Sequence, residues 1–205
     1  MTHQMRGQLR SGAVGSWYDR SLVRELRRTH TPATVFMTGL WARTYPGPAR
    51  ALARDRRFEI ENHSMDHRAW TQPCFGLPGV RSSPQKRAEV TAAAASIRRI
   101  TRVRPRYFRF PGGCHSKPDL RQVAARGEQP VDWDVVSGDA FQPDPQVIIR
   151  TVLQDVRPGS IVVMHMIGGP NAPATARAVR TLIPKLRGRG YRFVTLRTLL
   201  APRRR

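Results

Sequence analysis

Two histidines four positions apart, His63 and His67, have the spacing of a metal-binding pair. In one helical turn both imidazoles would face the same point, and neutral imidazole nitrogens bind zinc at about 2.0–2.1 Å. A nearby carboxylate would complete such a ligand set. Exposed helices often carry two histidines at this spacing, so the pair alone is a weak indication of a metal site.

Three further polar residues stand at or near the ends of apolar segments. Arg109 closes one segment, Asp139 follows a second, and His165 lies inside a third. Each has an ordinary structural explanation: a surface ion pair, a turn or helix cap, or a histidine satisfied within a core. Asp134 is a second carboxylate a few positions before Asp139. Only their combination points to a reactive site.

The elements that must position these residues alternate between strand-like and helix-like patterns. Apolar, β-rich runs occupy 33–38, 58–62, 107–110, 131–136, 161–166 and 192–196. Helical periodicity follows a possible cap at Asp19 and occupies 84–100, 144–156 and 174–186. Strands separated by helices of this length predict a parallel sheet and an α/β fold, a barrel or near-barrel. Functional residues of such folds gather where the strands end, which is where the polar residues stand.

The order and spacing of these motifs resemble the polysaccharide deacetylase family, the NodB-homology domain, from about residue 18 to 196. The resemblance rests on H-S-M-D-H at 63–67, R-F-P at 109–111, W-D-V-V-S-G-D-A at 133–140 and P-G-S-I-V-V-M-H at 158–165. It implies a distorted (β/α) barrel. It also implies a metal-dependent hydrolase that removes N-acetyl groups from an acetylated amino sugar polymer, either peptidoglycan or chitin-like.

The resemblance also implies a role for each residue. His63 and His67 match the family's zinc pair, and Arg109 matches the arginine that orients the catalytic aspartate. Asp139 matches the aspartate that tunes the catalytic histidine. His165 matches that histidine, which protonates the leaving amine. The expected partner is therefore an acetylated glycan, and the expected cofactor is zinc or another divalent metal.

One family motif has no counterpart in this chain. The family begins with a strand ending T-F-D-D-G, which supplies the base aspartate and, in most members, the third metal ligand. Residues 1–16 stand at that place and contain no Asp or Glu. We therefore expect a missing or altered first strand, a weakly held metal and impaired activity. Asp134 is the less favoured of the two carboxylates at 133–140.

These motifs predict three parts of the chain. Residues 1–17 form a non-matching segment, as a truncated or frameshifted start would produce, 18–200 form the deacetylase-like domain, and 201–205 form a basic tail. An inactive relative that only binds glycan is the main alternative. The particular polysaccharide and the oligomeric state are left open.

The composition is strongly basic: 36 Lys and Arg against 14 Asp and Glu give a formal net charge of +22. Such a charge permits nucleic acid, an anionic membrane or an anionic polymer as a partner. The arginines are scattered along the helical segments, and no basic stripe alternates with aromatic residues. We therefore expect no specific nucleic-acid partner, and a basic nucleic-acid-binding protein is the least favoured alternative.

The remaining compositional features concern location and cysteines. No run of 18 or more apolar residues is present, so we expect no membrane span. Met1–Arg10 is polar, which predicts no signal peptide, whereas the family is usually secreted or bound to the cell envelope. The location is therefore left open between the envelope and, for the chain as written, the cytoplasm.

Cys74 and Cys114 match neither a disulfide framework nor a zinc ribbon, and we expect free thiols.

Overall fold

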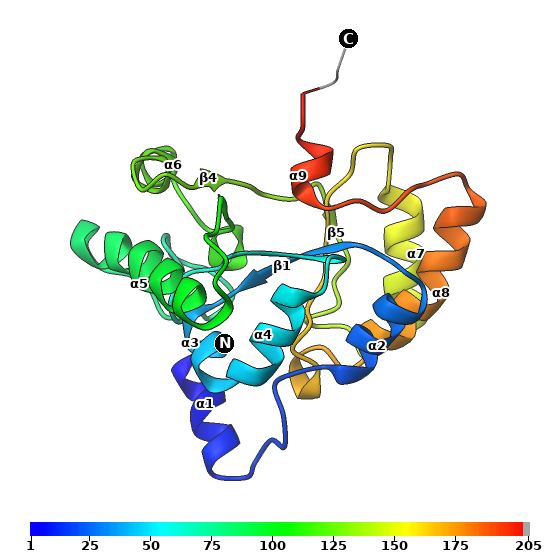
Figure 1. The fold of residues 1–205 in the computed structure, drawn as a ribbon. Helices are drawn as coiled ribbons and strands as arrows, with labels where there is room; N and C mark the ends of the chain where they lie inside the picture. The colour runs from blue at the N-terminus through cyan, green and yellow to red at the C-terminus, as the bar shows by residue number, and fades with distance from the viewer. Residues whose placement is uncertain (203–205) are drawn as a thin grey trace. The chain divides into compact units, whose positions relative to one another are not determined.

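The computed structural model describes residues 1–202, so the last three residues of the basic tail lie outside the described residues. In chain order the elements are α1 (His3–Arg10), α2 (Arg20–Arg28), β1 (Ala33–Met37), α3 (Gly39–Thr44), α4 (Pro46–Arg54), β2 (Phe58–Asn62), α5 (Ser83–Thr101), β3 (Tyr107–Phe108), the 3₁₀ turn η1 (Pro111–Gly113), α6 (Lys117–Ala124), β4 (Gln129–Pro130), β5 (Val135–Val136), α7 (Pro145–Asp155), β6 (Val162–Val163), η2 (Gly169–Asn171), α8 (Thr175–Gly188) and α9 (Leu196–Leu199). Figure 1 shows this succession along the chain. None of the helices described is long and apolar enough to cross a membrane.

The chain forms two compact units. Unit 1 consists of 1–6 and 34–132, and unit 2 consists of 7–33 and the chain from 133 onward. Unit 1 contains a sheet in the order β1-β2-β3-β4, in which β3 is parallel to both β2 and β4. Unit 2 contains the parallel pair β5 and β6. The predicted parallel pairing is confirmed for these strands.

The core of unit 1 lies between the sheet and helix α5, which also contacts α3 and α4 (Figure 1). Strand β2 is buried along its whole length, as expected for a strand covered on both faces. Aromatic rings dominate the core: Trp70 lies 5.7 Å from Phe108 and 5.0 Å from Phe110 between ring centroids. Edge-to-face packing of this kind fixes ring orientations as well as burying area. The residues on both sides of Arg109 are therefore anchored in this core.

Unit 2 is built on helices α7 and α8, which pack against each other and, through α7, against β5. Its core consists of Val135, Ile148, Ile149, Val152, Ala174, Ala178, Leu182 and Leu186. Helix α2 also contacts α8. This arrangement sets the ends of β5 and β6 beside the start of α8.

The predicted helix cap at Asp19 is confirmed by the structure. Asp19 Oδ1 accepts hydrogen bonds from the backbone N–H groups of Ser21 and Leu22 and thereby begins α2. Asp144 begins α7 in the same way, by accepting from Gln146. Short polar side chains satisfy the unpaired N–H groups of a first helical turn, which is why the cap at Asp19 could be recognised in the sequence.

Two strand predictions are corrected. No strand forms at 192–196: the segment is irregular and leads into α9. Tyr191 and Phe193 are half-buried against the core of unit 2, so the apolar pattern reports packing rather than strand pairing. Within the run expected at 131–136, only Val135–Val136 forms a strand, β5 in unit 2, whereas β4 lies just before the run, in unit 1.

The prediction of free thiols is wrong, because Cys74 and Cys114 form a disulfide. Their Cα atoms are 6.1 Å apart, within the normal range for such a bond. A hydrogen bond from the N–H of Trp70 to the carbonyl of Cys114 holds the two segments together. The spacing of the cysteines in the sequence gave no sign of this approach, which depends on the path of the loop between β2 and α5.

Candidate functional site

His63 and His67 lie in an irregular turn that follows β2. The predicted helical turn is wrong, because Ser64 and His67 both have φ of 67°, in the left-handed region. Side chains sustain the turn: the Asn62 amide oxygen accepts from the N–H of Ser64, and the Ser64 hydroxyl accepts from the N–H of His67. The two rings nevertheless meet, with centroids 4.8 Å apart. A strained turn rather than a helix therefore brings the imidazoles together.

The ring of His63 is oriented by the backbone of the next strand. Its Nδ1 lies 2.7 Å from the carbonyl oxygen of Arg109, so Nδ1 carries the proton and Nε2 keeps its lone pair. Burial of the ring, together with the positive charges of His67 and Arg109, holds the pKa of His63 well below its usual range. Metal-binding histidines commonly have this arrangement, a carbonyl on one nitrogen and a lone pair on the other.

Arg109 is fixed at both its backbone and its side chain. Its N–H donates to the carbonyl of Asn62 over 3.0 Å, which places it beside the end of β2. Its guanidinium lies over the ring of Phe36, 4.4 Å from the centroid. Phe36 in turn meets the ring of His63 edge to face. Unit 1 therefore gathers His63, His67 and Arg109, as the sequence predicts.

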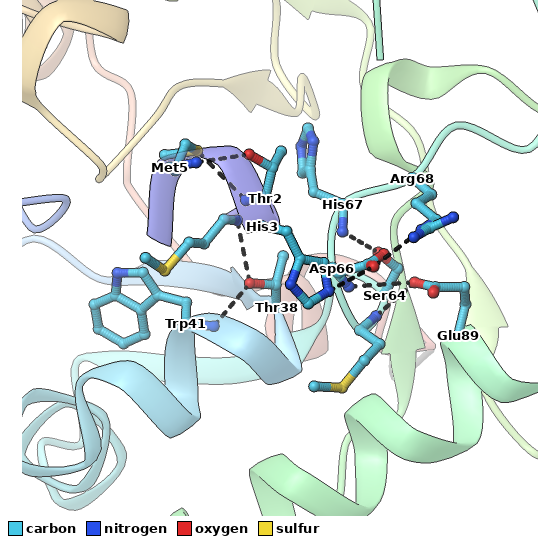
Figure 2. A network of polar contacts seen from close by, with 12 residues as sticks. Thr2, His3, Met5, Thr38, Trp41, Ser64, Asp66, His67, Arg68 and Glu89 are labelled. Carbon is cyan, nitrogen blue, oxygen red and sulfur yellow. Dashed lines mark hydrogen bonds and ion pairs between the residues drawn. The ribbon is translucent and has the colours of Figure 1, made fainter. Parts of the chain in front are cut away.

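Asp66, which stands between the two histidines in sequence, is directed to other partners (Figure 2). Its carboxylate pairs with Arg68 Nε at 2.9 Å and with His3 Nε2 at 3.2 Å. Glu89 supports the same turn, because its Oε2 accepts from the N–H groups of Met65 and Asp66. Burial and the neighbouring charge of Asp66 raise the pKa of Glu89 to about 7. Sequence reasoning missed Glu89, which lies on α5, because no local pattern connects it to the histidines.

Residues 1–6 also lie in unit 1. The Met1 amine donates to the Thr38 hydroxyl at 3.2 Å, and the Met1 and Met5 side chains are buried. Figure 2 shows His3 paired with Asp66, and Thr2 and Met5 hydrogen-bonded to each other in the same segment. Helix α1 thus lies at the start of the chain, at the place where the family resemblance calls for a strand that ends in two aspartates.

The donor set at the histidines fits a metal only in part. His63 and His67 offer imidazole nitrogens in suitable proximity. Among residues 1–202, however, no group of three or more His, Cys, Asp and Glu side chains is placed to hold a metal ion. Structural and catalytic zinc sites use at least three protein ligands. The two histidines alone therefore supply fewer ligands than such a site requires.

Unit 2 contains the second half of the predicted residues. Asp139 is buried, with 1% of its surface exposed, and its Oδ1 lies 2.8 Å from His165 Nδ1. Its Oδ2 accepts from the backbone N–H of His165 at 2.8 Å and from the Thr175 hydroxyl at 2.6 Å. Burial raises the pKa of the Asp139 carboxyl. The hydrogen bonds and charge of His165, together with the Thr175 hydroxyl, outweigh it and hold that pKa below its usual range. The carboxylate is therefore ionised and holds Nδ1–H of His165.

Asp134 does not contact Asp139 or His165 among the contacts described and has other partners. Its carboxylate accepts from the Ser160 hydroxyl and from the N–H of Ile161, which ties the start of β5 to the segment before β6. This is a structural role, consistent with its lower ranking from the sequence. The structure thus brings together His63, His67 and Arg109 in unit 1 and, separately, Asp139 and His165 in unit 2.

Comparison with known proteins identifies the class. The family model "Polysaccharide deacetylase" matches residues 13–130. A chitooligosaccharide deacetylase of Azorhizobium caulinodans is 30% identical over 181 residues, covering 82% of this chain and 81% of that protein. A peptidoglycan-N-acetylglucosamine deacetylase of Bacillus cereus is 28% identical, covering 85% of this chain and 78% of that protein. The chain belongs to the polysaccharide deacetylase family.

The solved structures agree with this assignment. A peptidoglycan N-acetylglucosamine deacetylase matches with a TM-score of 0.80 at 22% identity, covering 89% of this chain and 81% of that one, which shows the fold. A CE4 family pseudoenzyme from Bacillus anthracis matches with a TM-score of 0.78 at 26% identity, covering 90% of this chain and 62% of that one. The predicted α/β fold of the NodB type is confirmed.

This chain corresponds to only part of some relatives. It spans about half, 54%, of an uncharacterized Bacillus subtilis protein, YlxY, with which it is 28% identical over 188 residues, or 92% of this chain.

Proposed function

We propose that this protein is a metal-dependent hydrolase that removes N-acetyl groups from an acetylated amino sugar polymer, peptidoglycan or chitin-like, and that its activity is impaired. The observation that carries the proposal is the buried Asp139 carboxylate hydrogen-bonded to Nδ1 of His165. A histidine oriented by a carboxylate is the usual arrangement of a general acid or base. The relatives named as deacetylases of chitooligosaccharide and peptidoglycan support the substrate class.

His165 is the proton donor in this proposal. Asp139 holds the ring with Nδ1–H directed inward, which leaves Nε2 as the nitrogen that can give a proton. Hydrolysis adds the hydroxyl of water to the acetyl carbon and breaks the carbon–nitrogen bond. The departing amine needs a proton, and Nε2–H supplies it. Asp139 stabilises the charged imidazolium before the transfer.

His63 and His67 would hold the metal. The Arg109 carbonyl keeps the proton of His63 on Nδ1, which leaves Nε2 free to bind a metal. A zinc ion held there would polarise the acetyl carbonyl and lower the pKa of its bound water to about 7. With two histidines and no third ligand from the described part of the chain, we expect the metal to be held weakly.

The impairment follows from the missing carboxylates. Residues 1–16 contain no Asp or Glu, and Asp66 is paired with Arg68 and His3. Loss of a general base typically costs about 10²–10⁴-fold in rate. The similarity to a pseudoenzyme of the CE4 family, a mutant of which is described as having restored enzymatic activity, supports the same interpretation.

The second candidate is an inactive relative that only binds glycan, and the similarity to the pseudoenzyme favours it. Acetate release from N-acetylglucosamine oligomers, measured with added zinc, separates the two. We expect little or no release from the chain as it stands and recovery when a strand ending in two aspartates is placed ahead of Ser11.

A His165→Ala substitution in the restored chain should then abolish the activity. Release at rates normal for an enzyme from the unaltered chain would refute the impairment. A restored chain that binds the oligomers and stays inactive would instead favour the glycan-binding protein.

A further inference from the structure

The hydroxyl of Thr175 contacts the carboxylate of Asp139 from the first residue of α8. The distance from Thr175 Oγ1 to Asp139 Oδ2 is 2.6 Å, and the threonine is fully buried. The two residues are 36 positions apart in sequence. The hydroxyl therefore reaches the carboxylate through the packing of unit 2 rather than through a local turn.

The Thr175 proton has one good acceptor. The other oxygen near Oγ1 is the carbonyl of Ala172, at 3.5 Å, which is at the limit of a hydrogen bond. At 2.6 Å the Asp139 carboxylate is both closer and charged, so the O–H of Thr175 is committed to it.

The second hydroxyl beside Asp139 belongs to Ser137, and its proton goes elsewhere. Ser137 Oγ lies 2.7 Å from the carbonyl of Val163 but 3.1 Å from Asp139 Oδ1. A hydroxyl has a single proton to donate. Because the shorter contact is to the carbonyl, Ser137 donates to Val163, and Thr175 is the hydroxyl that serves Asp139.

The two carboxylate oxygens consequently have different partners. Oδ1 faces His165 Nδ1, whereas Oδ2 accepts from the backbone N–H of His165 and from Thr175. Rotation of the Asp139 carboxyl about its Cβ–Cγ bond would break all three of these hydrogen bonds. In the described part of the chain, His165 is the ionisable side chain that contacts Asp139.

We propose that Thr175 is a positioning residue: its hydroxyl holds Asp139 Oδ2, so that Oδ1 stays directed at His165 Nδ1 and the proton-donating Nε2 is kept in one orientation. This inference rests on the proposed function of His165 as the acid. Its structural part, the control of the Asp139–His165 pair by a hydroxyl, can be measured without substrate or metal.

The test compares three substitutions in the full chain. Thr175→Val keeps the size and branching of the side chain but removes the donor. Thr175→Ser keeps the donor and removes the methyl group. Thr151→Val is the matched control, because Thr151 also lies in a helix of unit 2 and donates only to a carbonyl of that helix, Val147, among the contacts described.

The readout is the pH titration of the Asp139 carboxyl carbon and of the His165 ring nitrogens by NMR, with signals assigned through Asp139→Asn. Loss of a hydrogen bond to a carboxylate should raise the Asp139 titration midpoint by about one pH unit in Thr175→Val. Thr175→Ser and Thr151→Val should titrate like the parent chain. In Thr175→Val the nitrogen signals should also report exchange between tautomers.

An unchanged midpoint in Thr175→Val, or an equal shift in Thr151→Val, would overturn the proposal. So would a serine variant that behaves like the valine variant. If Thr175→Val does not fold, Thr175→Cys takes its place, since a thiol is a weak donor and should give a smaller shift in the same direction.

Activity in a chain with the two aspartates restored gives a separate readout. There Thr175→Val should move the acid side of the kcat profile to higher pH, because His165 needs an ionised Asp139. If no such chain releases acetate, the proposed function fails while the NMR result still decides the role of Thr175.

Discussion

Raising the pH should destabilise unit 1 through the buried carboxyl of Glu128. This residue is 6% exposed, and its Oε1 accepts from the Asn62 side-chain amide at 3.1 Å. Its Oε2 is buried without a hydrogen-bond partner among the described residues. Burial, reinforced by the nearby charge of Glu61, raises the pKa of Glu128 from 4.5 to about 8. The group matters to the site because the same Asn62 holds the turn that carries His63 and His67.

The direction and size of the effect follow from proton binding. The folded protein holds the Glu128 proton more tightly than the unfolded chain, whose carboxyl titrates near 4.5. The resulting stabilisation is therefore complete below about pH 4.5 and is lost as the pH rises to about 8. A gap of about 3.5 pKa units, at ~1.4 kcal/mol per unit, corresponds to about 5 kcal/mol of unfolding free energy.

Urea unfolding of the parent chain and of Glu128→Gln, between pH 5 and pH 8.5, measures this. The glutamine variant keeps an oxygen for Asn62 and carries no titrating group, so it should be about as stable as the parent at pH 5 and more stable at pH 8.5. Glu25→Gln, compared with the parent from pH 5 down to pH 3, provides a contrast of opposite sign. The hydrogen bond with Arg28 lowers the pKa of Glu25 despite burial, so the parent gains stability from that carboxylate above about pH 4.5 and loses it on further acidification. Parallel pH profiles for the parent and Glu128→Gln would refute the reasoning.

Two further predictions concern the metal pair and the disulfide. Zinc should bind at His63 and His67 but be removed by dialysis against a chelator, and His63→Ala should abolish the binding; stoichiometric, chelator-resistant zinc would point to a third ligand. Reduction of the disulfide, or Cys74→Ser with Cys114→Ser, should lower the unfolding free energy by about 4 kcal/mol, since a loop of about 40 residues is no longer closed. Urea midpoints of oxidised and reduced protein measure this, and equal midpoints would count against it.

The sequence determined the features that depend on neighbours within a few positions. Asp19 was recognisable as a helix cap because its side chain accepts from N–H groups two and three residues ahead. Most strand positions were also predictable, because runs such as 33–37 and 161–164 are apolar or β-branched nearly throughout. The order of the polar motifs along the chain was sufficient to identify the family.

Contacts between distant segments were decided by the tertiary structure alone. The turn at 63–67 is not helical, because side chains of Asn62 and Ser64 hold it in a left-handed conformation that its H-x-x-x-H spacing does not reveal. The disulfide and the Asn62–Glu128 bond join positions 40 and 66 apart.

The same limit applies to the partners of the proposed acid. Asp139 and His165 could be named from their motifs, but the hydroxyl of Thr175 reaches Asp139 only because α8 begins beside the ends of β5 and β6. A buried carboxylate accepts hydrogen bonds from the donors that the packed core places near it, since leaving the charge unpaired costs several kcal/mol. Sequence patterns record which residues are polar, and the fold decides which of them meet.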